Sequence, residues 1–171
     1  MPIVDTDLLL RLSGGAANTD PDLALGGIMS TTTAISPTVA EENLFNNFTA
    51  AETTAGSTKY RGLYLLNNHG SISLTASAVY IPTQTPSTTT AVAIALAGEG
   101  VNATMETIAN ETTAPAGESF TAPATFGAGL STGTLTFGQR YGLWVRVIVD
   151  ALSPAYNNDD YQIAWQGTTT A

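Results

Sequence analysis

The stretch Arg140-Tyr-Gly-Leu-Trp-Val-Arg-Val-Ile-Val149 decides the fold class of this chain. Apolar residues recur at every second position, with Tyr141, Leu143, Val145, Val147 and Val149 on one face and Trp144, Arg146 and Ile148 on the other. A repeat of two residues indicates a β-strand, because successive side chains of a strand point to opposite faces. We therefore expect residues 140–149 to form the strongest strand of the chain.

Weaker patterns of the same period lie elsewhere in the chain. They cover residues 7–12, 60–67, 71–81, 92–96 and 161–166, where Ile163 and Trp165 share one side. The runs 60–67 and 71–81 are separated by Asn68-His-Gly70, a turn in which Gly70 is free to adopt positive φ. We expect these two runs to pair as a β-hairpin, with Ile72, Leu74 and Ala76 on one face.

Turn-rich stretches separate these strands, at residues 13–21, 82–90, 115–117 and 153–160. Several short strands with such turns favour an all-β fold. We expect an antiparallel β-sandwich of jelly-roll-like form over residues 58–171.

Residues 1–57 contain only short apolar pieces between Gly-Gly and Thr runs. We expect an extended N-terminal arm with early strands, which becomes ordered on the surface of a partner because it buries little area alone. Within it, Ser36-Pro37 suits the start of a helix that would reach Phe45. The following Asn-Asn-Phe-Thr49 interrupts that pattern, so helix and irregular structure both stay open.

Charge is scarce and unbalanced. Charged residues make up 11% of the 171 residues, against roughly 25% in an ordinary soluble domain. Five Lys and Arg stand against fourteen Asp and Glu, for a net charge of −9. Nucleic acids and anionic membranes both bind through cations, so neither is expected as a partner. A surface of Thr, Ser, Asn, Gln, Ala and Gly instead suits burial against other proteins.

Other whole classes of chemistry lack their residues. The chain has no cysteine, which removes disulfides, thiolate nucleophiles and Cys-based metal sites. Its N-terminus has no signal-peptide pattern, and no run approaches the roughly 20 apolar residues of a membrane span. We expect a protein made in the cytoplasm of its host that stays soluble.

Catalytic candidates are few. His69 is the single histidine and sits in a turn, where a polar residue is expected for structural reasons. Carboxylate pairs occur at Asp20/Asp22, Glu41/Glu42, Glu106/Glu111 and Asp159/Asp160. None follows the ligand spacing of a calcium loop, although Asn157-Asn-Asp-Asp160 is the best group of oxygen ligands.

The remaining motifs also have structural interpretations. Gly98-Glu-Gly100 is half of a dinucleotide fingerprint and indicates a turn. Trp144 and Trp165 could stack on sugars, but their places in strands favour core or interface packing. Arg146 needs a carboxylate partner, for which Asp150 is nearest in sequence. We therefore assign no catalytic, cofactor-binding or metal-binding residue and expect no enzyme.

Several strings resemble a family of small virion structural proteins of tailed bacteriophages. They are Arg11-Leu-Ser-Gly-Gly-Ala-Ala-Asn-Thr-Asp-Pro21, Leu25-Gly-Gly-Ile28, Tyr60-Arg61, Asn67-Asn-His-Gly-Ser-Ile-Ser-Leu74, Val79-Tyr-Ile81, Gly100-Val-Asn-Ala-Thr-Met-Glu-Thr-Ile-Ala-Asn-Glu111, Ala114-Pro-Ala-Gly117 and Leu143-Trp-Val-Arg146. The chain departs from the family pattern at Arg146-Val147, where a pair of arginines is more usual. The resemblance implies a part of a phage particle.

Among such parts we expect a capsid decoration (cement) protein on the outer capsid surface. Its partners would be the major capsid protein and other copies of itself, as a trimer or dimer. The alternative is a tail, baseplate or collar component, with adhesion through Trp144 and Trp165. A third class, a polysaccharide hydrolase, would require Glu106 or Glu111 in an acidic cleft.

Overall fold

The computed structural model describes residues 3–36, 43–155 and 159–170, and nearly all of its regular structure is β. The strands are β1 (Leu8–Leu12), β2 (Gly26–Gly27), β3 (Ser57–Asn67), β4 (Ser73–Thr83), β5 (Thr90–Leu96), β6 (Met105–Thr107), β7 (Leu130–Leu135), β8 (Arg140–Val149) and β9 (Gln162–Thr170). The helical elements are α1 (Ala50–Ala55) and the 3-10 turns η1 (Asp5–Asp7), η2 (Pro21–Leu23) and η3 (Phe126–Ala128).

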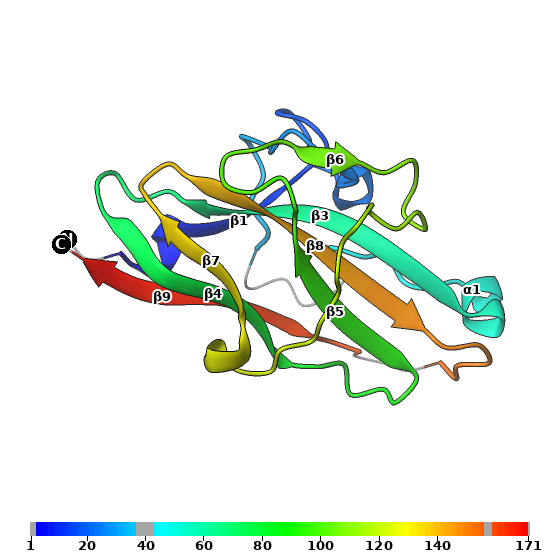
Figure 1. Cartoon of the computed structure of the whole chain (residues 1–171). Coiled ribbons are helices and arrows are strands. Elements are labelled where there is room, and N and C mark those ends of the chain that lie inside the picture. The colour runs from blue at the N-terminus through cyan, green and yellow to red at the C-terminus, as the bar shows by residue number, and fades with distance from the viewer. Residues whose placement is uncertain (1–2, 37–42, 156–158, 171) are drawn as a thin grey trace.

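Two antiparallel sheets pack face to face, which confirms the predicted β-sandwich (Figure 1). The four-stranded sheet has the order β1-β3-β8-β5, and the three-stranded sheet has the order β7-β4-β9. A two-stranded β2–β6 ladder lies outside the four-stranded sheet (Figure 1). The molecule therefore has three layers, with the four-stranded sheet in the middle.

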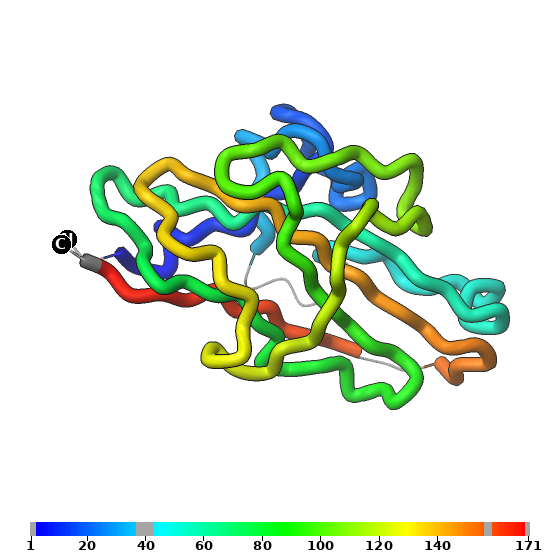
Figure 2. Tube along the Cα trace, in the orientation of Figure 1, coloured from blue at the N-terminus to red at the C-terminus, as the bar shows by residue number. Residues whose placement is uncertain are grey.

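The predicted hairpin between residues 60–67 and 71–81 is wrong. β3 pairs with β1 and β8, whereas β4 lies in the other sheet between β7 and β9. Consecutive strands alternate between the sheets from β3 to β5 and again from β7 to β9, as the path of the chain in Figure 2 shows. Since both edges of β3 are already paired, the chain must cross the sandwich after Asn67.

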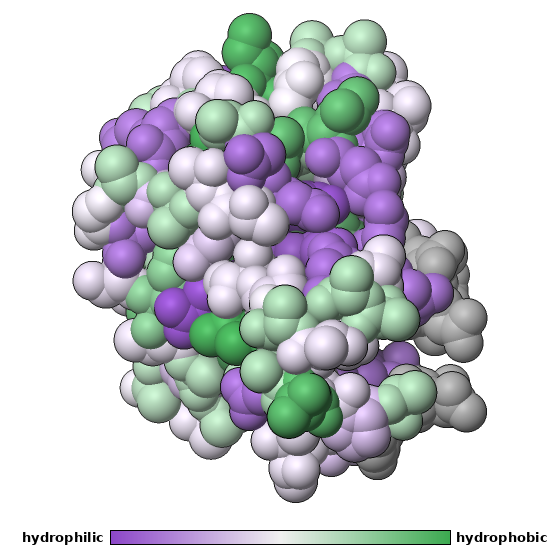
Figure 3. Space-filling view, turned by 90° about the vertical axis from the view of Figure 1, so that its right-hand side faces the viewer, coloured by the Kyte–Doolittle hydropathy of each residue, from purple (hydrophilic) through white to green (hydrophobic). Residues whose placement is uncertain are grey.

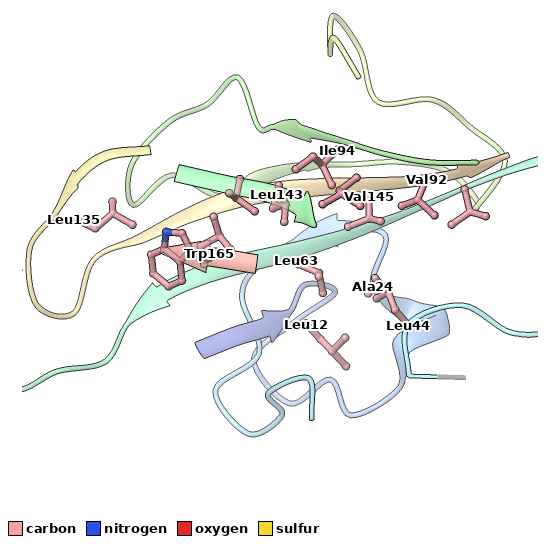
Figure 4. Packing of buried hydrophobic residues seen from close by; sticks show 14 of the residues in the cluster. Leu12, Ala24, Leu44, Leu63, Val92, Ile94, Leu135, Leu143, Val145 and Trp165 are labelled. Atoms are coloured by element: carbon pink, nitrogen blue, oxygen red, sulfur yellow. The ribbon is translucent and has the colours of Figure 1, made fainter. Parts of the chain in front are cut away.

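The main core lies between the two sheets. From β8 it takes Leu143, Val145 and Val147, three of the residues that the alternation places together on one face. Val92 and Ile94 of β5 lie beside them, and Leu135 and Trp165 come from the three-stranded sheet (Figure 4). Burying one such side chain contributes about 1.5–3 kcal/mol, so this contact is a principal source of stability.

A second core covers the outer face of the four-stranded sheet. Trp144 and Tyr64 are fully buried there, against Met105 and Ile108 from the segment around β6. The Tyr64 hydroxyl donates to Gly27 O at 2.6 Å and accepts from Met105 N at 2.9 Å, so one side chain holds both strands of the β2–β6 ladder. The backbone approaches so closely that a Cβ at Gly26 (φ +89°) would meet Glu106 O at 1.8 Å.

A bulge in β4 changes the face predicted for Ala76. Leu74 points into the core as expected, but Ala76 has φ 47° and is exposed. Register shifts on either side of it move the inward positions to Val79 and Ile81. A single extra residue reverses the side-chain alternation of a strand, and period alone does not reveal it.

The described part of residues 1–57 lies against the sandwich of its own chain. β1 pairs with β3, and Leu12, Ala24 and Leu44 are buried in the main core. The segment is largely irregular, as expected of an arm, but it does not project from the sandwich. A domain boundary between residues 57 and 58 stays a prediction.

Helical structure differs from the sequence analysis in one place. The stretch proposed for a helix, Ser36–Phe45, falls mainly on residues 37–42, outside the described residues. Instead α1 follows Thr49, whose hydroxyl accepts from Glu52 N while the Glu52 carboxylate accepts from Thr49 N. The string Thr49-Ala-Ala-Glu52 is a capping box and could have predicted it. No helix in the described ranges is long and apolar enough to cross a membrane.

Asn67 holds the point at which the chain crosses the sandwich. Its side chain is fully buried, and Nδ2 donates to Ile72 O at 3.0 Å and to Leu135 O at 2.9 Å. We predict that Asn67→Ala lowers the free energy of unfolding by about 2–4 kcal/mol, since buried carbonyls lose their donors. Urea denaturation measures this loss.

The neighbouring Asn68→Ala is the matched control, because Asn68 is exposed and its one hydrogen bond to a described residue runs from its backbone N–H to Asp7 O, at 2.7 Å. It should change stability by less than about 0.5 kcal/mol. Equal losses in the two variants would contradict the role assigned to the Asn67 amide.

Candidate interaction surface

His69 has a structural place in the turn. Its Nδ1 accepts from the backbone N–H groups of Ser71 and Ile72, both at 3.0 Å. The imidazole thus organises the connection between β3 and β4. This geometry supports the structural interpretation of His69.

Glu106 and Glu111 have separate surroundings. The Glu106 carboxylate accepts from Ala116 N, in the loop after β6. Glu111 instead forms ion pairs with Lys59 and Arg61. The two carboxylates therefore bind different groups, and neither arrangement resembles the facing pair of a glycosidase.

The other acidic pairs also bind their own chain. Asp20 caps η2 by accepting from Asp22 N, and Asp22 pairs with Arg61. Asp159 accepts from Ser87 N at 3.0 Å. Glu41, Glu42, Asn157 and Asn158 lie outside the described residues. Within the described ranges, no three His, Cys, Asp or Glu side chains are grouped so that they could hold a metal.

Both tryptophans pack into cores. Trp144 is 0% exposed in the outer core and Trp165 is 7% exposed in the main core, so neither ring offers a face for a sugar. The partner predicted for Arg146 is wrong. Its guanidinium lies 4.8 Å from the ring centroid of Phe120, and Asp150 is not among its contacts in the described structure. A cation–π contact thus takes the place of the expected ion pair.

A cluster that the sequence analysis missed surrounds Lys59 and Arg61 on β3. The side chains of these cations are only 5% and 1% exposed. Lys59 Nζ lies 2.9 Å from Glu52 Oε1 and 3.2 Å from Glu111 Oε1. Arg61 Nη2 lies 2.9 Å from Asp22 Oδ1 and also contacts Glu111. The cluster therefore joins η2, α1 and the loop after β6 to one strand.

Aromatic rings complete this cluster. Lys59 Nζ lies 4.8 Å from the ring centroid of Phe48, and the Arg61 guanidinium lies 5.3 Å from that of Phe45. The spacing Lys59-x-Arg61-x-Leu63 places both cations on the face of the core residue Leu63. That spacing was the one available signal, since the carboxylates come from distant segments.

The environment of the cluster favours ionised carboxylates. A hydrogen bond from Asn46, with help from Arg61 and Lys59, lowers the pKa of Asp22 below its ordinary 3.8 despite the opposing effect of burial. For Glu52, burial acts to raise the pKa, but hydrogen bonds from Thr49 and Lys59 outweigh it and leave the pKa below the ordinary 4.5.

Charge is segregated by sheet. All five cations lie on strands of the four-stranded sheet, namely Arg11, Lys59, Arg61, Arg140 and Arg146. The strands β4, β7 and β9 contain no Asp, Glu, Lys, Arg or His. The three-stranded sheet is therefore free of charged side chains, in a chain whose net charge is −9.

The outer face of this sheet is polar but uncharged. The Tyr80 hydroxyl donates to Gln166 Oε1 at 3.0 Å, and the hydroxyls of Thr75 and Thr168 form a hydrogen bond of 2.9 Å. Tyr80 also packs edge-on against Phe126, which is 40% exposed. Such a face loses little hydration energy when another protein covers it, so it is the candidate interaction surface.

Exposed apolar residues are not gathered at the end of the molecule where α1 lies. Figure 3 shows hydrophobic residues there scattered among hydrophilic and neutral ones. Among the described residues, Leu23, Ile28, Phe137 and Leu152 are the most exposed large apolar side chains beside Val4, and Leu23 lies in η2 while the other three lie in separate loops.

No protein-family model matches this chain, and a search of curated proteins finds no match.

We predict that Glu111→Gln lowers the free energy of unfolding by about 1–3 kcal/mol. Glu111 bridges Lys59 and Arg61, so its neutralisation leaves each buried cation with a single carboxylate. Urea denaturation at neutral pH measures the loss.

Glu118→Gln is the matched control. Desolvation and the nearby Glu99 and Glu106 raise the pKa of Glu118, so its charged form is disfavoured by folding. The amide oxygen can still accept from Gly98 N, and stability should be unchanged or higher. A loss as large as that of Glu111→Gln would contradict the importance of the cation cluster.

The same cluster predicts a pH dependence. The pKa of Glu52 is lowered by folding, so its contribution is present above the ordinary value of 4.5 and is lost as pH falls through the folded value. Wild type should be more stable than Glu52→Gln at about pH 6, and the difference should shrink toward zero near about pH 3. Urea titrations of both proteins across this pH range test the prediction. A difference in stability that stays constant with pH would refute a stabilising role for the ionised Glu52 carboxylate.

Proposed function

We propose that this chain is a non-enzymatic structural protein of a tailed-phage particle, and most specifically a capsid decoration protein. It would bind the major capsid protein on the outer surface of the capsid and associate with copies of itself. The observation that carries the proposal is the three-stranded sheet without charged side chains, whose outer face is polar and exposed. The resemblance of strings such as Asn67-Asn-His-Gly-Ser-Ile-Ser-Leu74 to phage virion proteins supports it.

Physical considerations favour the outer surface of the particle. A net charge of −9 repels packaged DNA, and the acidic residues that the structure describes lie in loops, turns, α1 and β6 rather than on the two large sheets. An uncharged sheet can be buried against protein at low desolvation cost. The uncharged sheet thus suits a protein neighbour, and the acidic loops suit solvent.

Decoration would act mechanically. A protein that bridges neighbouring capsid subunits adds buried area, which internal pressure must expose before the shell opens. The sandwich suits this role, because strands drawn from residues 8–170 are hydrogen-bonded into two sheets that pack on one core.

The second candidate is a tail, baseplate or collar component. It shares the need for an uncharged protein-binding face. Adhesion through Trp144 and Trp165 is not favoured, since both rings are buried in cores.

The deciding experiment is the copy number of this protein per purified particle, from quantitative mass spectrometry against the major capsid protein. Decoration predicts on the order of one copy per capsid subunit, or a simple fraction of it set by capsid symmetry. Roughly a few dozen copies or fewer would assign the chain to the tail or portal region and overturn decoration.

A further inference from the structure

We propose that the free edge of β9 (Gln162–Thr170) is the surface through which two copies of this chain associate, by antiparallel pairing of β9 with β9 of the second copy. The inference rests on the proposed function, whose self-association it assigns to one strand. Its basis is a comparison of the four sheet edges of the sandwich, because an exposed strand edge invites pairing unless it is protected.

The edge of β5 is protected by side chains and by a bridge. The Gln84 amide donates to Val92 O at 2.6 Å and accepts from Val92 N at 3.1 Å, in the manner of a neighbouring strand. Thr85 donates to Thr90 O at 2.8 Å. Ile94 exchanges two backbone hydrogen bonds with Thr121, at 2.8 and 2.9 Å. Backbone groups of Thr90, Val92 and Ile94 along this edge are therefore already hydrogen-bonded within the chain.

The edge of β1 is covered by residues 30–35, which follow β2. Ile35 N donates to Leu10 O at 2.7 Å, and Ser30 N donates to Leu12 O at 2.8 Å. Arg11 forms a bridge with Ala34. A second strand cannot add here without displacing residues of the same chain.

The edge of β7 is short and irregular. Its six residues contain an extra residue opposite Ser77 and Ala78, with Gly133 at φ 70°. Thr132 turns inward, is 4% exposed and hydrogen-bonds with Ser77. A bulge of this kind bends an edge strand away from the geometry that a partner strand needs.

The edge of β9 has none of these protections among the described residues. The strand is nine residues long and pairs with β4 on one side only. The extra residues of that pairing lie on β4, so β9 itself is regular. Its sequence, Gln-Ile-Ala-Trp-Gln-Gly-Thr-Thr-Thr, contains neither a charge nor a proline, the usual guards of an edge.

A second copy of the chain fits this edge for electrostatic reasons. Two molecules of charge −9 repel each other, and the repulsion is weakest where the uncharged three-stranded sheets meet. A two-fold axis near Gln166, the middle residue of β9, would place Gln166 opposite its copy. The pairing would extend each three-stranded sheet into a continuous six-stranded one across the axis.

Sedimentation of the purified full chain over a range of concentrations tests the proposal. Wild type is expected to form dimers, and Gln166→Glu should raise the dissociation constant by about tenfold or more, since like charges would face each other across the axis. The Tyr80 hydroxyl can still donate to the carboxylate introduced by this substitution, so the fold should be kept. Gln139→Glu, which adds the same charge at an exposed turn between β7 and β8, should leave the dissociation constant unchanged.

Hydrogen exchange at low and high protein concentration provides an independent readout. Dimerisation through β9 should slow the exchange of alternate amides of residues 162–170 and leave those of β5 unchanged. A monomer at all concentrations would overturn the proposal, as would a dimer without protection in β9. A trimer would also overturn it, because an edge paired with its own copy is then fully occupied.

The dimerisation of the chain and its copy number per particle can be decided independently of each other. A monomer that is present at about one copy per capsid subunit would refute this inference and leave decoration intact. A β9-paired dimer with a low copy number per particle would support the inference and refute decoration.

Discussion

The burial of β3 on both faces is the constraint on which the rest of the structure depends. Its inner face contributes Leu63 and Leu65 to the main core, and its outer face contributes Tyr60 and Tyr64 to the second. A strand covered on both sides and paired at both edges cannot fold back on its successor. The chain therefore crosses to the other sheet after Asn67, and the segments around β2 and β6 must form a third layer over the outer face.

The same constraint explains the buried charges. β3 carries Lys59 and Arg61 toward the interior, where an unpaired cation would be very unfavourable. Asp22, Glu52 and Glu111 reach these cations from three segments that are far apart in the chain. The ion pairs thus determine which loops close the end of the sandwich. With the cations committed to one sheet, the opposite sheet is left without charge and is suited to contact with other proteins.

Much of the fold could be predicted from local pattern. The alternation over residues 140–149 predicted β8 and which of its side chains share a face, and the pattern of Ile163 and Trp165 did the same for β9. The predicted hairpin was wrong because an Asn-His-Gly turn can return the chain to the same sheet or carry it across to the opposite sheet. The predicted face of Ala76 was wrong because the bulge there depends on how β4 pairs with its neighbours and not on the residues of β4 alone. The cation cluster was missed because its carboxylates are contributed by segments 39 and 50 residues away from Arg61.

The sequence by itself determined the fold class, the strands with strong alternation, the acidic net charge and the scarcity of charged side chains. These properties are local or additive, so no knowledge of the partner strands is needed. Only the tertiary structure decided which strands pair, how charge is divided between the two sheets, and which sheet edge is left without protection. Each of these is a relation between distant segments, such as Gln84 with Val92 or Tyr64 with Gly27, and exists only once the chain has closed around its two cores.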